Sequence, residues 1–207
     1  DGRWDMKRMV KKIVSSQIYL QQSAVSSFLR EKDPSNNLLA RQGRWRVDAE
    51  FVRDGALKIS DLLNDEKLGG ESVKPYQPAG FWQHLNFPRK VWKASEGDDL
   101  YRRSVYTFRC RTFPHPSMVA FDATSREECT AERSRSNIPQ QALVMLNDPI
   151  FVEASRVFGT RIAERKGTSS EKIAWALTEA LSREGTTEEV ELLAQDYQSQ
   201  LEKFKKD

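Results

Sequence analysis

Apolar residues between positions 44 and 63 recur with the spacing of a helix, and this pattern constrains the fold more than any other in the chain. The series is Trp45, Ala49, Val52, Ala56, Ile59 and Leu63, at intervals of 4, 3, 4, 3 and 4 residues. Such intervals place all the side chains along one face of an α-helix. The sequence therefore predicts an amphipathic helix over 44–63.

A second apolar stripe opens the chain, within residues 4–29. It consists of Met6, Met9, Val10, Ile13, Val14 and Ile18, with Lys7, Lys11 and Lys12 largely opposite. This pattern predicts an amphipathic helix with a solvated basic face, weakening through its serine-rich end. The run Asp33-Pro34-Ser35-Asn36-Asn37 that follows predicts a turn.

Helix-start signals recur in the last third of the chain. Asn137 precedes Ile138-Pro139-Gln140, and Asp148 precedes Pro149, which predicts helices that start near 138 and at 149. Thr168 with Glu171 and Thr186 with Glu189 have the spacing of capping boxes, and predict helices over 169–183 and 187–205. We expect a mainly α-helical (all-α) fold, with six or seven helices around one core in a single domain over 1–207.

Residues 64–97 form a long irregular segment in this interpretation, because glycine and proline interrupt it repeatedly. The segment is rich in aromatic residues, Trp82 and Trp92 among them. These rings either pin the loop to the core or line a ligand cleft, and the first interpretation is favoured because large aromatics dominate core burial. From Asp99 to about Phe113 the pattern fits a helix or an alternating strand, with the helix preferred, and 113–124 is expected to be extended or turn-like.

The stretch between Lys93 and Lys166 contains ten arginines and no lysine, and from Asp98 onward it has nine acidic residues. Arginine forms bidentate pairs with carboxylates and oxyanions that lysine cannot match. The favoured interpretation is a structural ion-pair network, and the alternative is a site for sulfate, phosphate or uronate groups. The residues that could bind these groups are Arg126, Arg133 and Arg135, near the predicted helix start at Asn137. Trp82 and Trp92 are further candidate binding residues.

Catalytic candidates are few. Asp122 and Glu127 flank a turn and could form the paired carboxylates of a glycoside hydrolase, although salt bridges are the favoured interpretation. His115, between Pro114 and Pro116, could act as a general acid or base. The cysteines and histidines lack metal-ligand spacing, so no cofactor is predicted. Cys110 and Cys129 could form a disulfide or remain two buried thiols.

The charge balance limits the class of partner. The chain has 33 basic and 30 acidic residues, a net charge of +3, without the unbalanced basic stripe typical of a nucleic-acid-binding protein. No apolar run is long enough for a membrane helix.

Three strings in order carry a resemblance to a known family: DLYRRSVYTF, FDATSREECT and SNIPQQALVMLNDPIFVEASR. The chain resembles the planctomycete cytochrome-associated C-terminal domains (planctomycete PSD-one), a family of unknown function. It departs from the family pattern at Ile138-Pro139, where Thr-Pro is usual, and at Cys110.

The resemblance implies a C-terminal part of a larger exported protein, located in the periplasm or at the cell surface. The expected partners are upstream domains of the same polypeptide, including a c-type cytochrome domain in some members, and polysaccharide. The family pattern is expected to begin before Asp1. Two functions follow as hypotheses: an accessory or interaction domain that binds a partner domain or polysaccharide, or an enzyme that acts on sulfated polysaccharide or is coupled to cytochrome electron transfer.

Overall fold

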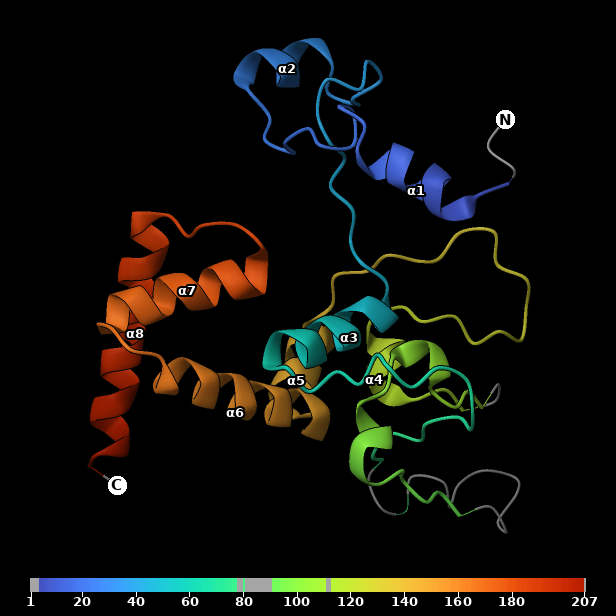
Figure 1. The fold of residues 1–207 in the computed structure, drawn as a ribbon, viewed down its shortest axis with the longest axis vertical. Coiled ribbons are helices and arrows are strands. Elements are labelled where there is room, and N and C mark those ends of the chain that lie inside the picture. Colours follow the sequence, from blue (N-terminus) through green and yellow to red (C-terminus); the bar gives the residue numbers. More distant parts are fainter. Residues whose placement is uncertain (1–3, 78–79, 81–90, 111–112, 207) are drawn as a thin grey trace. The chain divides into compact units, whose positions relative to one another are not determined.

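The computed structural model describes residues 4–77, 80, 91–110 and 113–206 (Figure 1). Within these ranges the chain has eight α-helices, two short 3₁₀ helices and no β-strand beyond two isolated bridges. The predicted mainly helical fold is confirmed. The contacts within the chain divide it into two compact units, residues 1–46 and residues 47–207. The prediction of one domain within a larger exported protein stays a prediction.

The first unit contains α1 (Met6–Val14) and α2 (Ser27–Lys32). The carboxylate of Asp5 caps α1 by accepting a hydrogen bond from the backbone N–H of Arg8 at 3.1 Å. The helix predicted to run to residue 29 ends at Val14. The cause is local, because the Ser16 hydroxyl donates to the carbonyl of Ile13 and accepts from the backbone N–H of Tyr19, and such bonds compete with helix propagation.

The predicted turn after α2 is confirmed and is closed by polar groups. The buried carboxylate of Asp33 accepts hydrogen bonds from the backbone N–H groups of Asn37 and Leu38, at 2.8 and 2.9 Å. The Arg41 guanidinium donates to the carbonyls of Asp33 and Pro34, at 2.9 and 2.7 Å. The hydrogen bond from the Leu38 N–H is the main reason why the pKa of Asp33 lies below its ordinary value.

The second unit begins with α3 (Ala49–Ser60), which is shorter than the predicted 44–63. Asp48 holds the N-cap position, and Asp61 leaves the helix in the left-handed conformation, with φ of 67°. Trp45 therefore lies outside the helix, although its position fits the spacing of the apolar series.

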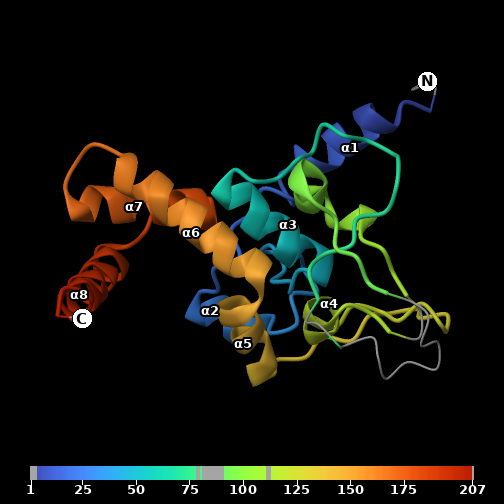
Figure 2. The same ribbon diagram turned by 90° about the horizontal axis from the view of Figure 1, so that it is seen from below.

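The core of the second unit lies where α3 packs against α6 (Pro149–Glu164), with α5 (Pro139–Asn147) and α4 (Pro116–Ala120) beside them (Figure 2). Its buried apolar side chains include Leu57, Met118, Ile150, Phe151 and Ala154. The cap of α6 is as predicted, since the Asp148 carboxylate accepts from the backbone N–H of Ile150. The helix α5 starts close to the expected position, but its N-cap is Ile138 and not Asn137, and no side-chain hydrogen bond caps it. The short helix α4 was also missed within the segment expected to be extended, although Pro116 suits its first turn.

The helix favoured over 99–113 is replaced by two 3₁₀ helices, η1 (Gly97–Tyr101) and η2 (Ser104–Tyr106), followed by extended backbone to Cys110. Tertiary hydrogen bonds impose this conformation. The buried guanidinium of Arg53 on α3 donates to the carbonyls of Leu100 and Arg102, and Asp54 accepts from the backbone N–H of Ser104 at 2.7 Å. These bonds take up main-chain groups that a continuous helix would use.

A second buried arginine fixes part of the irregular segment after α3. The guanidinium of Arg102 donates to the carbonyls of Lys67, Gly69 and Glu71 and lies over the Tyr106 ring, 4.2 Å from its centre. The described part of this segment therefore has a fixed path despite its lack of helices and strands.

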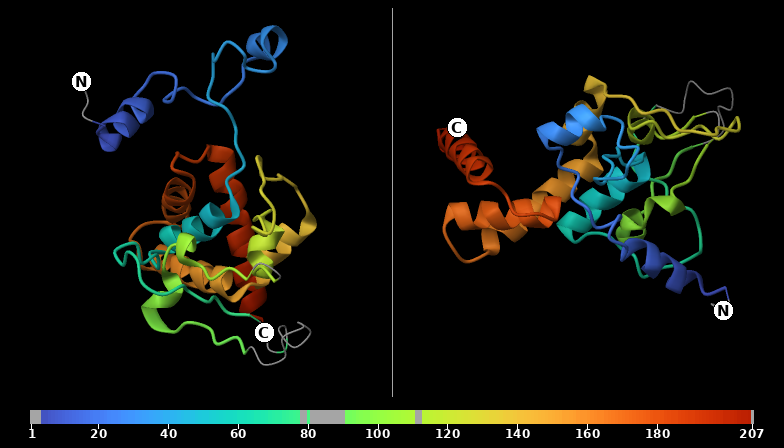
Figure 3. Two further views of the ribbon diagram at one scale, coloured as in Figure 1. Left: turned by 90° about the vertical axis from the view of Figure 1, so that its right-hand side faces the viewer. Right: turned by 90° about the horizontal axis from the view of Figure 1, so that it is seen from above.

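The chain ends in α7 (Ser169–Leu181) and α8 (Thr187–Phe204), which pack on each other (Figure 3). Both predicted capping boxes are present, with Glu171 and Glu189 bonded back to the backbone N–H of Thr168 and Thr186. Neither helix has a fully buried residue, and Leu193 and Tyr197 of the α8 stripe are 42% and 49% exposed.

Candidate functional site

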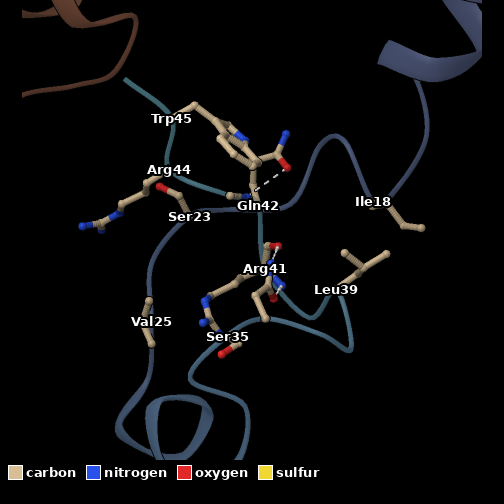
Figure 4. Close-up of a pocket in the computed structure, with 11 residues that line it drawn as sticks. Ile18, Ser23, Val25, Ser35, Leu39, Arg41, Gln42, Arg44 and Trp45 are labelled. Carbon is tan, nitrogen blue, oxygen red and sulfur yellow. Dashed lines mark hydrogen bonds between the residues drawn. The ribbon is translucent and has the colours of Figure 1, made fainter. Parts of the chain in front are cut away.

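A cavity of about 520 Å³ lies within the first unit and is open to solvent (Figure 4). We call it the 18–45 cavity after its first and last lining residues. Its lining comprises Ile18, Ser23, Val25, Ser35, Asn36, Leu39, Arg41, Gln42, Gly43, Arg44 and Trp45. The cavity thus combines an aromatic ring and two guanidinium groups with hydroxyl and amide groups, within the size range of small-ligand sites.

Trp45 presents a large exposed ring at this cavity, with 72% of the residue accessible to solvent. Its indole folds back over Gly43, so closely that a Cβ atom at position 43 would come within 2.7 Å of the indole Nε1. Gly43 itself is tied down by a hydrogen bond from its backbone N–H to the side-chain carbonyl of Gln42, at 3.2 Å. Glycine at position 43 therefore permits this ring placement.

Hydrogen bonds within the loop also fix the polar side of the cavity. The Asn36 side chain donates to the carbonyl of Arg41 at 2.8 Å and accepts from its backbone N–H at 3.3 Å. The Arg41 guanidinium is held by two carbonyls, whereas Arg44 is exposed. The cavity therefore has one immobilised cationic group and one directed to solvent.

The charge of the first unit differs from that of the chain as a whole. Residues 1–46 contain ten basic and four acidic side chains, a net charge of +6, whereas residues 47–207 contain 23 and 26, a net charge of −3. A local excess of one sign raises the concentration of oppositely charged ligands near that surface. The net charge of the whole chain, +3, hides this asymmetry between the two units.

Arg133, one of the predicted anion ligands, lies in an arginine–carboxylate cluster. Its guanidinium donates to Glu50 at 2.7 Å and lies 3.4 Å from Asp48, and Arg109 donates to the same Glu50 carboxylate. Burial acts to raise the pKa of Glu50, but the hydrogen bond from Arg133 and the charges of both arginines outweigh it, so the pKa lies below its ordinary value. This geometry supports the structural network for these residues.

Asp122 has a structural role. It follows α4 in the left-handed conformation, with φ of 61°, and its carboxylate accepts from the backbone N–H and the hydroxyl of Ser136, at 2.7 and 2.8 Å. Glu127, Arg126 and Arg135 are exposed, and Arg135 takes part in an interaction of its own.

His115 is buried at a cleft of only about 10 Å³, which has room for roughly one water molecule. Its Nε2 lies 2.8 Å from the carbonyl of Tyr76 and its Nδ1 lies 2.7 Å from the Ser117 hydroxyl. Burial lowers the pKa of this imidazole. A neutral ring with its proton on Nε2 satisfies both contacts, since Nε2–H donates to the carbonyl and Nδ1 accepts from the hydroxyl.

Of the two predicted tryptophans, Trp92 is half-buried. Its indole N–H donates to the carbonyl of Pro75 at 2.8 Å, and its ring packs at 5.8 Å from that of Phe108. This agrees with the interpretation that loop aromatics pin the segment. Trp82 lies outside the described residues. Cys110 and Cys129 are not joined by a disulfide, and the first is half-buried and the second exposed.

Comparison with known proteins agrees with the family resemblance that the sequence strings indicate. The family model of PSD1, described as a protein of unknown function (DUF1553), matches residues 1–197. The chain belongs to the PSD1 family. No curated protein and no solved structure matches the chain. In the part of this PSD1 chain that the structure describes, no helix is both long and apolar enough to cross a membrane.

Proposed function

We propose that this PSD1 chain is a non-catalytic accessory domain of an exported multidomain protein, and that it binds an anionic polysaccharide in the 18–45 cavity. The observation that carries the proposal is the exposed Trp45 ring beside Arg44 in a cavity of the unit whose net charge is +6.

The chemistry of the lining fits a sugar that carries sulfate or carboxylate groups. The flat apolar face of an indole packs against the C–H face of a sugar ring, and a guanidinium binds an oxyanion through two parallel hydrogen bonds. The hydroxyl groups of Ser23 and Ser35 and the amide of Gln42 can exchange hydrogen bonds with sugar hydroxyl groups. The openness of the cavity to solvent suits one segment of a long polymer.

The alternative of an enzyme has less support from the residues predicted for it. The Asp122 carboxylate is bonded to Ser136, and both ring nitrogens of His115 have partners. Binding is therefore the function that the described geometry supports best.

The test is isothermal titration of the full chain with dextran sulfate and with neutral dextran. We expect binding of dextran sulfate alone, weakened on the order of tenfold by Arg44→Gln, which corresponds to about 1.4 kcal/mol. Trp45→Ala should weaken it similarly, and Trp45→Phe less, because a ring face remains.

Two matched variants are the controls. Arg30→Gln removes an equal charge from the exposed surface of the same unit, and Trp4→Ala removes an indole that is 96% exposed, and neither residue lines the cavity. Equal losses with Arg30→Gln and Arg44→Gln would show a diffuse basic surface and contradict the proposal. Binding of neutral dextran with the same affinity would contradict the proposal that the ligand is anionic.

A further inference from the structure

The helix α1 separates its apolar residues completely from its charged ones. The apolar residues follow one another at intervals of 3, 1, 3 and 1 and so share one face of the helix: Met6, Met9, Val10, Ile13 and Val14. The charged residues lie on the opposite face and are all basic: Lys7, Arg8, Lys11 and Lys12. The helix is therefore amphipathic, with a polar face of one sign of charge.

The apolar face of α1 is open to solvent. No residue of the helix is buried, and its five apolar residues are between 39% and 70% exposed. The other helix of the first unit, α2, lies away from it (Figures 1 and 3). A helix of nine residues is marginal in water when no packing supports it. A surface that covers the apolar face would therefore stabilise α1.

The charge of α1 indicates the kind of surface that suits it. Among the α-helices that lie in the described ranges, α1 alone has four charged residues of the same sign, whereas α2, α3, α6, α7 and α8 each combine acidic and basic residues. A helix with four positive charges and no negative one is attracted to a negatively charged surface. The partner of α1 must therefore be both apolar and anionic.

The positions of the lysine residues restrict the partner further. Lys7 lies three residues before Val10, and Lys12 lies three residues after Met9, so basic residues border the apolar face along both edges. The stem of a lysine side chain can follow an apolar surface while its ammonium group reaches polar groups. An anionic lipid bilayer provides hydrocarbon beneath such a helix and negatively charged headgroups along both edges. A groove on a protein would match only if both of its rims were acidic.

Trp4 adds an aromatic ring next to this helix. It directly precedes the N-cap residue Asp5 and is 96% exposed. Tryptophan is enriched at the boundary between membrane and water, where its ring lies at the level of the headgroups. Its place beside α1 favours the lipid surface over the acidic protein groove.

We propose that α1 binds the surface of an anionic lipid bilayer. The helix lies in the plane of the headgroups, with its apolar face towards the hydrocarbon and its basic residues beside the lipid phosphates. No residue of α1 lines the 18–45 cavity, so this inference does not depend on polysaccharide binding.

The experiment is a flotation assay of the full chain with two kinds of vesicle. One is phosphatidylcholine alone, and the other is equal parts of phosphatidylcholine and phosphatidylglycerol. We expect the chain to bind the anionic vesicles at least tenfold more tightly, because the basic face is attracted to them. Equal affinity for both vesicles, or no binding of the anionic ones, would overturn the proposal, and the second result would point to an acidic protein partner.

Charge variants locate the contact. Lys11→Gln combined with Lys12→Gln should weaken binding of the anionic vesicles at least tenfold. Arg30→Gln combined with Lys32→Gln is the matched control, because it removes two charges from exposed residues of α2. Equal losses in the two double variants would show adsorption by the overall charge of the first unit and would overturn the proposal.

Uncharged variants test the apolar face separately. Met9→Gln combined with Ile13→Gln should also weaken vesicle binding at least tenfold, while affinity for dextran sulfate stays unchanged, because no charge is altered. Neither residue is buried, so the fold should be retained, as circular dichroism can check. Phe28→Gln combined with Leu38→Gln is the control, since these residues are 66% and 80% exposed elsewhere in the same unit. Full vesicle binding by the Met9 and Ile13 variant would show that α1 does not insert and would overturn the proposal.

Discussion

Arg102 and Arg41 hold their loops in the same way but in different surroundings. Each guanidinium donates to main-chain carbonyls: Arg102 to those of Lys67, Gly69 and Glu71, and Arg41 to those of Asp33 and Pro34. Arg102 is only 2% exposed, whereas Arg41 is half-buried at the edge of the 18–45 cavity.

This difference separates an arginine that only supports the fold from one whose charge can also serve a ligand. A buried guanidinium must be satisfied by protein groups, because water cannot replace them. At the edge of a cavity water can replace the lost hydrogen bonds, and the positive charge still acts on nearby anions. Burial, more than the number of hydrogen bonds, decides which arginines the fold depends on.

The largest expected effect is that of Arg102→Ala. It leaves carbonyls of the 67–71 loop without their donor, and it removes the cation over the Tyr106 ring. We expect a loss of about 3 to 5 kcal/mol in the free energy of unfolding, measured by urea titration. Arg103→Ala is the control, because the neighbouring side chain is exposed and should change stability by less than about 0.5 kcal/mol. Similar losses in the two variants would refute the role of burial.

Glu50→Gln should have an intermediate effect. Glu50 pairs with Arg109 and Arg133, and its side chain is only 17% exposed. Removal of its charge leaves two guanidinium groups facing a neutral amide, for an expected loss of about 2 kcal/mol at neutral pH. Glu127→Gln, on an exposed residue, should leave the unfolding free energy nearly unchanged.

The stabilisation from Glu50 should depend on pH in one direction. Because its folded-state pKa lies below the ordinary value of 4.5, the unfolded chain binds the proton more readily. The contribution is therefore fully present above pH 4.5 and is lost as the pH falls through the folded-state value. The stability difference between the native chain and Glu50→Gln should shrink below pH 4.5, and a difference that stays constant there would contradict this assignment.

Local signals in the sequence were sufficient to predict where the helices towards the C-terminal end of the chain start. The threonine–glutamate pairs at 168 and 186, and Asp148 before Pro149, fix helix starts through hydrogen bonds between residues two or three apart. Such contacts are visible in the sequence because both partners lie in the same turn.

The errors arose where distant residues decide the conformation. The helix expected after Asp99 gave way to 3₁₀ turns because Arg53 and Asp54, some 50 residues earlier, bond to the backbone at 100–104. Likewise the partner of Arg133 is Glu50, 83 residues away, so the sequence could predict an arginine–carboxylate network but not its members. The 18–45 cavity could not be predicted from the apolar pattern of the sequence either, because Trp45 fits the apolar stripe that predicts a helix over 44–63. The clustering of basic residues in 1–46 was the signal that could have located it.

Apart from the controls, Arg41→Ala has the smallest expected effect on stability, and this variant tests the comparison with Arg102 most directly. Of the two carbonyl partners of Arg41, that of Pro34 is exposed to water, and that of Asp33 keeps the hydrogen bond from the backbone N–H of Asn36, so we expect a loss below about 1 kcal/mol by urea titration. Dextran sulfate affinity should nevertheless fall severalfold, because the lining loses a cationic group. Arg41→Lys should restore part of the affinity through its charge, without the paired carbonyl contacts. A large loss of stability with unchanged affinity would instead show that Arg41, like Arg102, serves the fold alone.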